Sequence, residues 1–329
     1  MSTIKPIRDH AADIRPKRFE DFTGQSAQCK RLQVSVIAAK AREDAIAHVL
    51  LTGPPGLGKT TLAGIIAAEM GTRLLVASGP GLETTEDITR HLITLEPGDV
   101  FFIDEIHRLQ RTLEEFLYPV MEDFEGDIVF RGSPAHVRFP QFTVIGATTR
   151  SGLVSKPMLT RFPIVEHLDF YEVADLTCIV ARSAEIMGLN MDPDAAVEIA
   201  RRSRGTARIA NNLLSRIRDY AYATGAAVID CGTAVAGLDM LDIDGQGLTL
   251  LDRRLLRLIV EKFGGGPAGV GSLAVALGEE PDTLSHTVEP YLIRLGLMAR
   301  TPQGRVATQS AFELLGIKPT SEESGVSLM

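Results

Sequence analysis

The glycine-rich segment Gly53–Thr60 has residue types and a spacing suited to holding phosphate groups. It reads Gly-Pro-Pro-Gly-Leu-Gly-Lys-Thr, a complete P-loop pattern, between the apolar run Val49–Leu51 and the helix-forming stretch Thr61–Met70. Strand, loop and helix in that order are the context the motif requires. Glycines let backbone N–H groups close around phosphate oxygens, and the helix start adds a favourable field. With Lys59 as a cation for the outer phosphates and the Thr60 hydroxyl as a metal ligand, the segment predicts a site for ATP and Mg²⁺.

An apolar run ending in two carboxylates follows further along the chain. Val100–Ile103 predicts a buried strand, and Asp104 and Glu105 come directly after it. Carboxylates at the end of a buried strand are costly unless something uses them. With a P-loop present, we expect Asp104 to bind Mg²⁺ through water and Glu105 to polarise the attacking water. A solvated strand end is the alternative. His107 is interpreted as a structural polar residue and not as a catalyst.

Polar residues after the acidic pair are candidates for sensing the nucleotide. Phe142–Gly146 predicts another buried strand, and Thr148 and Thr149 follow it. A polar side chain beside the acidic strand can contact a γ-phosphate, and we prefer Thr148, with Thr149 as the close competitor. Arg161 and Arg208 come later in the chain. Single arginines are usually surface charges, but their placement after a P-loop core makes both of them candidate catalytic cations.

The scaffold for these residues is predicted over residues 14–168. Helix-period stretches alternate there with short apolar runs that turn residues bound. This alternation is typical of an α/β fold with a mostly parallel sheet. The apolar runs are His48–Thr52, Arg73–Ala77, Asp99–Ile103 and Phe142–Gly146.

Two smaller domains are predicted after the sheet. Residues 169–241 hold helix-period stretches and no convincing strand, which indicates a small helical domain. After a linker at 242–247, residues 248–318 predict helices followed by a hairpin around the turn Thr301–Gly304, a pattern typical of a winged helix. A small interaction domain is the alternative. Residues 1–13 and 319–329 are expected to be a flexible N-terminus and a tail. The predicted helices are Val173–Met187, Pro193–Arg202, Ile209–Thr224, Leu248–Phe263, Gly271–Leu277 and Pro281–Leu295.

The composition limits the class of protein. The chain is 45% hydrophobic and 23% charged, which is ordinary for a globular protein. No apolar run is long enough for a membrane span, and Met1–Arg15 lacks a secretory signal pattern. Cys29, Cys178 and Cys231 are far apart and suit neither a zinc site nor a disulfide framework, so we expect a cytoplasmic protein. The net charge of −8 argues against adhesion to nucleic acid by the whole surface.

A local basic stretch stands out in this acidic chain. Tyr291–Phe312 contains Arg294, Arg300 and Arg305 and no acidic residue. Such a cluster is the footprint expected for contacts to phosphates. Arg300 and Arg305 flank the predicted hairpin turn, so we expect them to bind double-stranded DNA.

Taken together, these motifs resemble the RuvB family, bacterial AAA+ motors that drive Holliday-junction branch migration. The resemblance runs from Arg15 to Gly316. Its specific stretches are Arg15–Lys17, Phe22–Gln25, Gly53–Leu62, Leu95–Leu109, Leu117–Pro119, Met121–Asp123, Ile145–Arg150, Ala200–Thr206, Arg208–Asn211, Lys262–Pro267, Glu289–Ile293 and Arg300–Pro302.

The resemblance implies a large AAA+ domain, a small helical domain and a winged helix, working as a homohexamer on duplex DNA with ATP between subunits. It implies that Tyr171 lines the base pocket with the start of the chain, that Arg161 reaches a neighbour's γ-phosphate, and that Arg208 reports hydrolysis to the small domain. Thr60 and Asp104 would hold the metal. The residues expected to bind the nucleotide are Ile14, Arg15, Gly56, Gly58, Lys59, Thr60, Thr61, Glu122, Asp123, Phe124, Arg161, Tyr171 and Arg208.

Three features depart from the family pattern. The segment Asp127–Thr143 is short, although in the family it forms a hairpin that docks on the junction-binding partner RuvA. Ile128–Phe130 and His136–Phe139 are still expected to pair around a turn near Gly132. Pro281 and Gln303 stand where arginine is usual, which means fewer phosphate contacts. Pro163, after the candidate finger, fixes a backbone angle there.

The leading hypothesis is an ATP-driven DNA translocase that migrates Holliday junctions with a RuvA-like partner. A clamp-loader-like AAA+ switch and a regulatory relative that binds ATP and DNA without migrating junctions are the alternatives. Stimulation of ATP hydrolysis by duplex DNA distinguishes the motor from the regulator.

Overall fold

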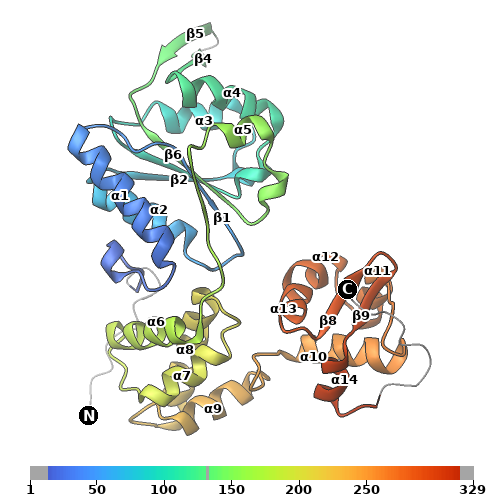
Figure 1. Cartoon of the computed structure of the whole chain (residues 1–329). Helices are drawn as coiled ribbons and strands as arrows, with labels where there is room; N and C mark the ends of the chain where they lie inside the picture. The colour runs from blue at the N-terminus through green and yellow to red at the C-terminus, as the bar shows by residue number, and fades with distance from the viewer. Residues whose placement is uncertain (1–13, 131–132, 319–329) are drawn as a thin grey trace. The chain divides into compact units, whose positions relative to one another are not determined.

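The computed structural model describes residues 14–130 and 133–318, which form parts of two compact units, Met1–Cys231 and Gly232–Met329. Each unit is described by itself. The flexible N-terminus predicted at 1–13 and the tail predicted at 319–329 lie outside the described residues. Figure 1 shows the elements of both units along the chain.

The first unit is built on a five-stranded sheet with the order β2-β3-β6-β1-β7, in which every neighbouring pair is parallel. The predicted α/β fold with a parallel sheet is confirmed. Because the strands are parallel and in register, their carboxyl ends meet at one edge, where the order of the strands places ligands. The strands are β1 (Val49–Thr52), β2 (Leu74–Ser78), β3 (Val100–Asp104), β6 (Thr143–Thr148) and β7 (Ile164–His167).

The edge strand β7 is the one strand of this sheet that the sequence pattern does not predict. It is four residues long and mixes exposed Val165 with buried Glu166, so it lacks the apolar run of the central strands. Arg31 on the first helix forms an ion pair with Glu166 and makes the burial of that carboxylate possible. The burial of Glu166 in β7 therefore depends on a partner from another part of the chain, which the local sequence pattern does not show.

Helices cover both faces of the sheet. α3 (Thr85–Leu92), α4 (Arg111–Glu122) and α5 (Lys156–Thr160) share a core with Phe101 and Val144. The long α1 (Ser26–Arg42) and α2 (Lys59–Met70) lie together on the other face (Figure 1). Alternate side chains of a strand point to opposite faces, which is why Phe101 and Phe102 are both fully buried, in different layers.

The predicted hairpin is present. Strand β4 (Glu125–Phe130) pairs antiparallel with β5 (Ser133–Arg138), with Ile128 opposite Ala135. Its turn residues 131 and 132 lie outside the described residues, so the predicted turn is described only in part.

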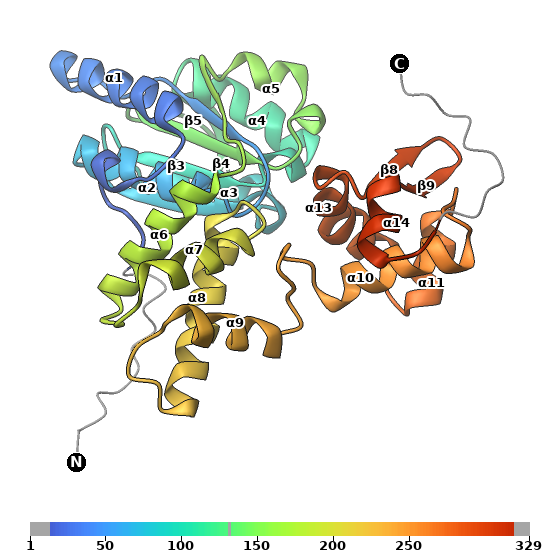
Figure 2. The same ribbon diagram turned by 60° about the horizontal axis from the view of Figure 1, so that its bottom comes forward.

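Three helices follow β7 and form a group beside the sheet, as Figure 2 shows. They are α6 (Val173–Ile186), α7 (Pro193–Arg201) and α8 (Ala207–Thr224), close to the predicted ranges. A further helix, α9 (Cys231–Met240), was not predicted. It contains Gly232 and Gly237, and glycine lowers intrinsic helix propensity. The division into compact units falls at the start of α9, whereas the domain boundary expected from sequence is at 241.

The second unit contains the winged helix. Leu255, Ile259, Leu273, Leu292 and Phe312 meet in its core. Two π-helical turns, Leu258–Lys262 and Leu284–Val288, continue the first and third helices. The other elements are α10 (Leu250–Arg257), α11 (Val270–Leu277), α12 (Pro281–Thr283), α13 (Glu289–Arg294), β8 (Met298–Thr301), β9 (Gly304–Ala307) and a final α14 (Gln309–Leu315), which the sequence pattern did not predict. None of the helices in the described part of the chain is long and apolar enough to cross a membrane.

Candidate functional site

A cavity of about 490 Å³ opens at the carboxyl edge of the sheet, where the P-loop, the acidic strand and the helical group meet. It brings together most of the residues predicted to bind the nucleotide, although they are spread along the chain. The predicted residues in its lining are Ile14, Arg15, Gly56, Gly58, Lys59, Thr60, Thr61, Asp104, Glu105, Thr149, Tyr171 and Arg208.

The P-loop runs from the end of β1 to the start of α2. Gly53 has φ +128°, and a Cβ there would lie 2.3 Å from the carbonyl oxygen of Leu168, so a larger residue would force the loop and the following connection apart. The buried Lys59 donates from Nζ to the carbonyl oxygens of Gly53 at 2.8 Å and Pro54 at 2.9 Å. Burial lowers the pKa of Lys59, against the opposing effect of the Glu105 and Asp104 carboxylates. An anion bound in the cavity can therefore replace the two carbonyl oxygens as the partner of the Lys59 ammonium.

Asp104 ends β3, and Glu105 leaves the strand in a left-handed conformation with φ +49°. That conformation is uncommon for a residue other than glycine and tends to occur at functional sites. Gly79 makes room for it, because a Cβ at Gly79 would lie 2.5 Å from the carbonyl oxygen of Glu105. The sequence analysis did not include Gly79 among the site residues. Its position directly after the neighbouring strand β2 is the signal that could have identified it.

The Glu105 carboxylate is held by Thr149. The Thr149 hydroxyl donates to Glu105 Oε2 at 3.0 Å, and the Thr149 N–H approaches the same oxygen at 3.3 Å. The preferred candidate Thr148 is fully buried, and its hydroxyl contacts His107 Nδ1 at 3.0 Å. The structure therefore brings Thr149 into the cavity and leaves Thr148 outside its lining.

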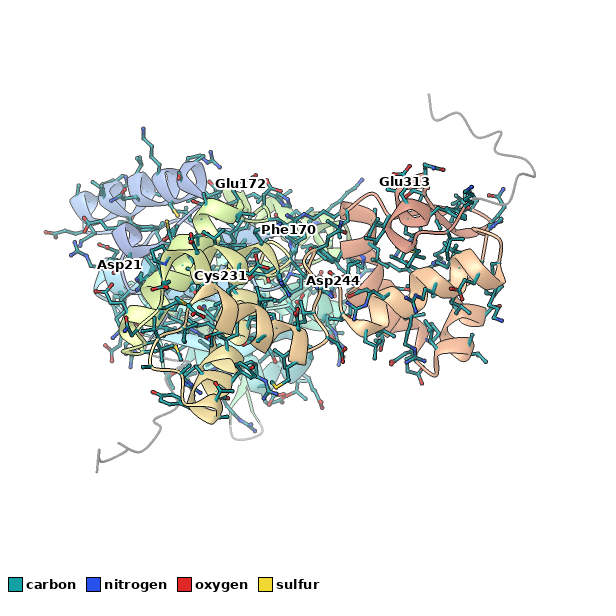
Figure 3. All side chains as sticks on the ribbon, turned by 90° about the horizontal axis from the view of Figure 1, so that it is seen from below. Asp21, Phe170, Glu172, Cys231, Asp244 and Glu313 are labelled. Atoms are coloured by element: carbon teal, nitrogen blue, oxygen red, sulfur yellow. The ribbon has the colours of Figure 1, made fainter. Side chains whose placement is uncertain are left out.

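The helical group closes the other side of the cavity. The buried Tyr171 donates from its hydroxyl to the carbonyl oxygen of Leu57 at 2.9 Å, and burial raises its pKa. The Arg208 N–H donates to the carbonyl oxygen of Gly56 at 3.2 Å. The first contact joins the P-loop to the segment after β7, where Figure 3 labels Phe170 and Glu172, and the second joins it to the start of α8.

Several cavity residues on the helical group were missed. Arg182 donates to the carbonyl oxygen of Ile14 at 3.2 Å, and Ser183 donates to Asn211 Oδ1 at 2.8 Å. A usable signal lay in α8, where Arg208, Asn211 and Ser215 recur at helical spacing and share one polar face.

Arg161 and the end of α4 form a second group that is outside the cavity lining. Arg161 forms an ion pair with Glu122 at 3.1 Å, and its guanidinium lies 4.5 Å from the centre of the Tyr118 ring. Its buried Nε has no hydrogen-bond partner among the described residues. Asp123 caps α4, and Phe124 packs edge-on against Phe142. Within one chain, the structure does not bring these predicted residues to the nucleotide cavity.

The two arginines predicted to bind DNA share one internal partner in the second unit. Glu289, whose side chain is 1% exposed, accepts from Arg300 Nε and from Arg305 Nε, each at 2.8 Å. The side chain of Arg305 is only 15% exposed, whereas that of Arg300 is 48% exposed. The stretch that lacks acidic residues is therefore partly neutralised by a carboxylate two residues before it begins. Arg305 is placed as an internal ion-pair partner rather than as an exposed cation.

The hairpin has one apolar and one charged face. Ile128 is buried in the core, while Glu125, Asp127, His136 and Arg138 lie on the other side. His136 contacts Asp127 Oδ1 at 2.9 Å and Glu125 Oε2 at 3.2 Å, and these hydrogen bonds raise its pKa. Arg138 donates to Glu125 Oε1 at 2.8 Å.

Comparisons with known proteins agree along the chain. Family models match residues 14–168 as the RuvB Holliday junction DNA helicase P-loop domain, residues 171–244 as the RuvB AAA lid domain and residues 245–316 as the RuvB C-terminal winged helix domain. The solved structure of the Thermotoga maritima RuvB Holliday junction branch migration motor is 46% identical, with a TM-score of 0.83 over 93% of this chain and 99% of that one. Two mutant forms of Thermotoga maritima RuvB, also 46% identical and with the same coverage, give TM-scores of 0.84 and 0.85. The predicted resemblance is confirmed, and this chain belongs to the RuvB family of AAA+ P-loop ATPases.

Proposed function

We propose that this protein is an ATP-driven DNA translocase that promotes Holliday-junction branch migration in recombination and repair. The observation that carries the proposal is the single cavity that joins a P-loop, an acidic pair and a lid of helices, in a chain that also contains a winged helix. The full-length match to a branch migration motor supports it over a clamp-loader-like switch or a regulator. We retain the cytoplasm as the expected location.

The cavity suits a nucleoside triphosphate with Mg²⁺. Backbone N–H groups at the start of α2 and the Lys59 ammonium would hold the phosphates. The Thr60 hydroxyl and the Asp104 carboxylate, both in the lining, would hold Mg²⁺, which neutralises phosphate charge when bound. Glu105 would orient the attacking water and accept its proton, and Thr149 would hold the Glu105 carboxylate in place. Arg208 links the phosphates to α8.

A second subunit would complete the site. Arg161, Glu122 and the adjoining Asp123 and Phe124 lie outside the cavity of their own chain. An arginine that neutralises a neighbour's γ-phosphate is a recurring device in phosphoryl transfer. We therefore propose a homohexamer in which Arg161 acts on the adjacent subunit and exchanges its partner Glu122 for phosphate.

DNA and a junction-binding partner would use other surfaces. Arg300 is the half-exposed cation of the wing and would contact DNA phosphates, which position a protein without reading sequence. The charged face of the β4–β5 hairpin would dock a RuvA-like protein through Asp127, His136 and Arg138.

The deciding experiment is migration of a synthetic four-way junction by the full chain and ATP, with and without the RuvA-type partner. The expected result is migration that requires ATP and increases with the partner. Glu105→Gln serves as the matched control, and it should bind ATP while hydrolysing it very slowly. Binding of ATP and duplex DNA without stimulated hydrolysis, and without junction migration in the presence of the partner, would contradict the motor and favour the regulator.

A further inference from the structure

His107 lies between the ends of β3 and β6 in the first unit. It follows β3 on a 3₁₀ turn, Ile106–Arg108, and its Nδ1 is 3.1 Å from Glu105 Oε2 and 3.0 Å from the Thr148 hydroxyl at the end of β6. Its side chain is only 7% exposed. The imidazole is therefore a buried polar group whose one ring nitrogen faces both the carboxylate and the hydroxyl.

The hydrogen-bond roles around this nitrogen follow from its partners. An ionised carboxylate has no proton and can only accept. Nδ1 must therefore carry the proton when it faces Glu105. The Thr148 hydroxyl oxygen already accepts the Arg150 N–H at 2.9 Å and retains a second lone pair for a shared Nδ1–H. A Nδ1–H tautomer can donate to both oxygens, whereas a bare Nδ1 would direct its lone pair at the lone pairs of Glu105 Oε2.

The contact has a consequence for the two carboxylate oxygens of Glu105. Oε2 is approached by His107 Nδ1, the Thr149 hydroxyl and the Thr149 N–H. Oε1 has only the longer Thr149 hydroxyl contact, at 3.3 Å, among the described residues. One oxygen is thus anchored, and the other keeps lone pairs for a water proton. This division is what a general base needs if its carboxylate is not to rotate.

We propose that His107 is a positioning residue for ATP hydrolysis, whose Nδ1–H anchors Glu105 Oε2 so that Oε1 takes the proton of the attacking water. The proposal rests on the role proposed for Glu105, and it gives His107 a role beyond the structural one inferred from the sequence. Burial also lowers the pKa of His107, which disfavours the imidazolium form.

The test exploits the geometry of the two amide side chains. The amide nitrogen of asparagine is two bonds from Cβ, the same as Nδ1 of histidine, so asparagine can replace an Nδ1–H donor. The amide nitrogen of glutamine is three bonds from Cβ, the same as Nε2 of histidine. ATP hydrolysis is measured without DNA for wild type, His107→Asn, His107→Gln and His107→Ala. The expected kcat falls about 10- to 100-fold for His107→Gln and His107→Ala, the usual effect of losing an orienting partner. KM stays within about twofold, and His107→Asn keeps most of the wild-type kcat.

A double-mutant cycle separates positioning from general structural damage. If His107 acts through Glu105, His107→Gln in a Glu105→Gln background changes the residual rate by less than about twofold. Equal losses in both backgrounds, or an Asn variant as slow as the Ala variant, overturn the proposal. Because the readout is hydrolysis without DNA, a chain that hydrolyses ATP but fails to migrate junctions contradicts the proposed function and leaves this test intact.

A measurement on the unmutated chain covers the case in which variants do not fold. Nitrogen-15 NMR of labelled histidine reports which ring nitrogen carries the proton. The expected result for His107 is the Nδ1–H tautomer. A Nε2–H tautomer means that Nδ1 cannot donate to Glu105, and it overturns the proposal without any substitution.

Discussion

Arg305 donates to the buried carboxylate of Glu289 through both Nε, at 2.8 Å, and Nη2, at 3.2 Å. Arg300 donates to the same carboxylate from the far side of the β8–β9 turn. One internal carboxylate therefore links both strands of the wing to α13. The two arginines differ in exposure, because Arg305 is largely buried and Arg300 is half exposed.

This difference in exposure predicts distinct outcomes for Arg300→Ala and Arg305→Ala. Arg300→Ala removes an exposed cation, so the slope of log affinity against log salt should fall by about 0.9, equally for unrelated duplexes. Arg305→Ala takes from the buried Glu289 its largely buried partner and should cost about 3 kcal/mol of stability, more than Arg300→Ala, because water screens the half-exposed Arg300. Duplex binding across a salt series and thermal unfolding measure the two effects. A normal melting temperature for Arg305→Ala, with a reduced salt slope, would show that Arg305 is the DNA contact after all.

A second prediction concerns Arg161. Arg161→Ala should lower ATP hydrolysis by roughly 10³-fold or more if the arginine stabilises charge on a neighbour's nucleotide. Mixing Arg161→Ala subunits with Lys59→Ala subunits should restore some activity at interfaces that combine one intact P-loop with one intact arginine. Arg111→Ala is the matched control, because it removes an exposed arginine that pairs with Glu115 and lies outside the cavity lining, and it should keep hydrolysis. No restoration in mixtures shown to co-assemble argues that Arg161 acts within its own chain.

The neighbouring threonines give a third prediction. Thr149→Val removes the hydroxyl that holds Glu105, so kcat should fall by about tenfold or more, and Thr149→Ser should recover most of it. Thr148→Val loses contacts to His107 and the Arg150 N–H, and it should lower stability by about 1–3 kcal/mol while reducing kcat less than Thr149→Val does. Steady-state kinetics and chemical denaturation of both valine variants test this order. A larger kcat loss for Thr148→Val would restore the original preference for Thr148.

Two histidines predict opposite effects of acid on stability. His48 accepts the Val144 N–H at Nδ1 and contacts the carbonyl oxygen of Met121 through Nε2, and burial lowers its pKa. The unfolded chain therefore takes up a proton first as the pH falls below about 6.5, and His48 costs up to about 1.4 kcal/mol per pH unit there. The pKa of His136 is raised, so its contribution is fully present below the unfolded pKa and is lost as pH rises through the folded one.

The measurement is the free energy of unfolding between pH 5 and 8 for wild type, His48→Gln and His136→Gln. His48→Gln should flatten the loss of stability on the acid side, since the glutamine does not titrate. His136→Gln should make that acid loss steeper, because a group that favours the protonated folded state is gone. Identical pH profiles for all three chains would contradict both assignments.

The sequence alone determined the parts of the site whose chemistry lies in contiguous residues. Gly53–Thr60 and Asp104–Glu105 each combine a strand end with the residues directly after it, so local order was enough to place them. The α/β class and the helical pattern before the wing followed from periodicity for the same reason. Strand β7 and helices α9 and α14 were not predicted, because the local sequence gives only a weak signal for them. The burial of Glu166 in β7 depends on Arg31, and α9 contains two glycines.

Only the tertiary structure decided between residues that differ by one position or pair across long stretches of chain. The sequence favoured Thr148 over its close competitor Thr149. In the fold, Thr148 ends β6 and contacts His107, whereas Thr149 follows the strand and contacts Glu105. The stretch without acidic residues predicted two exposed cations. In the structure, α13 packs against the wing, and its Glu289 pairs with both arginines. Side-chain direction and long-range pairing come from packing, and no local pattern encodes them.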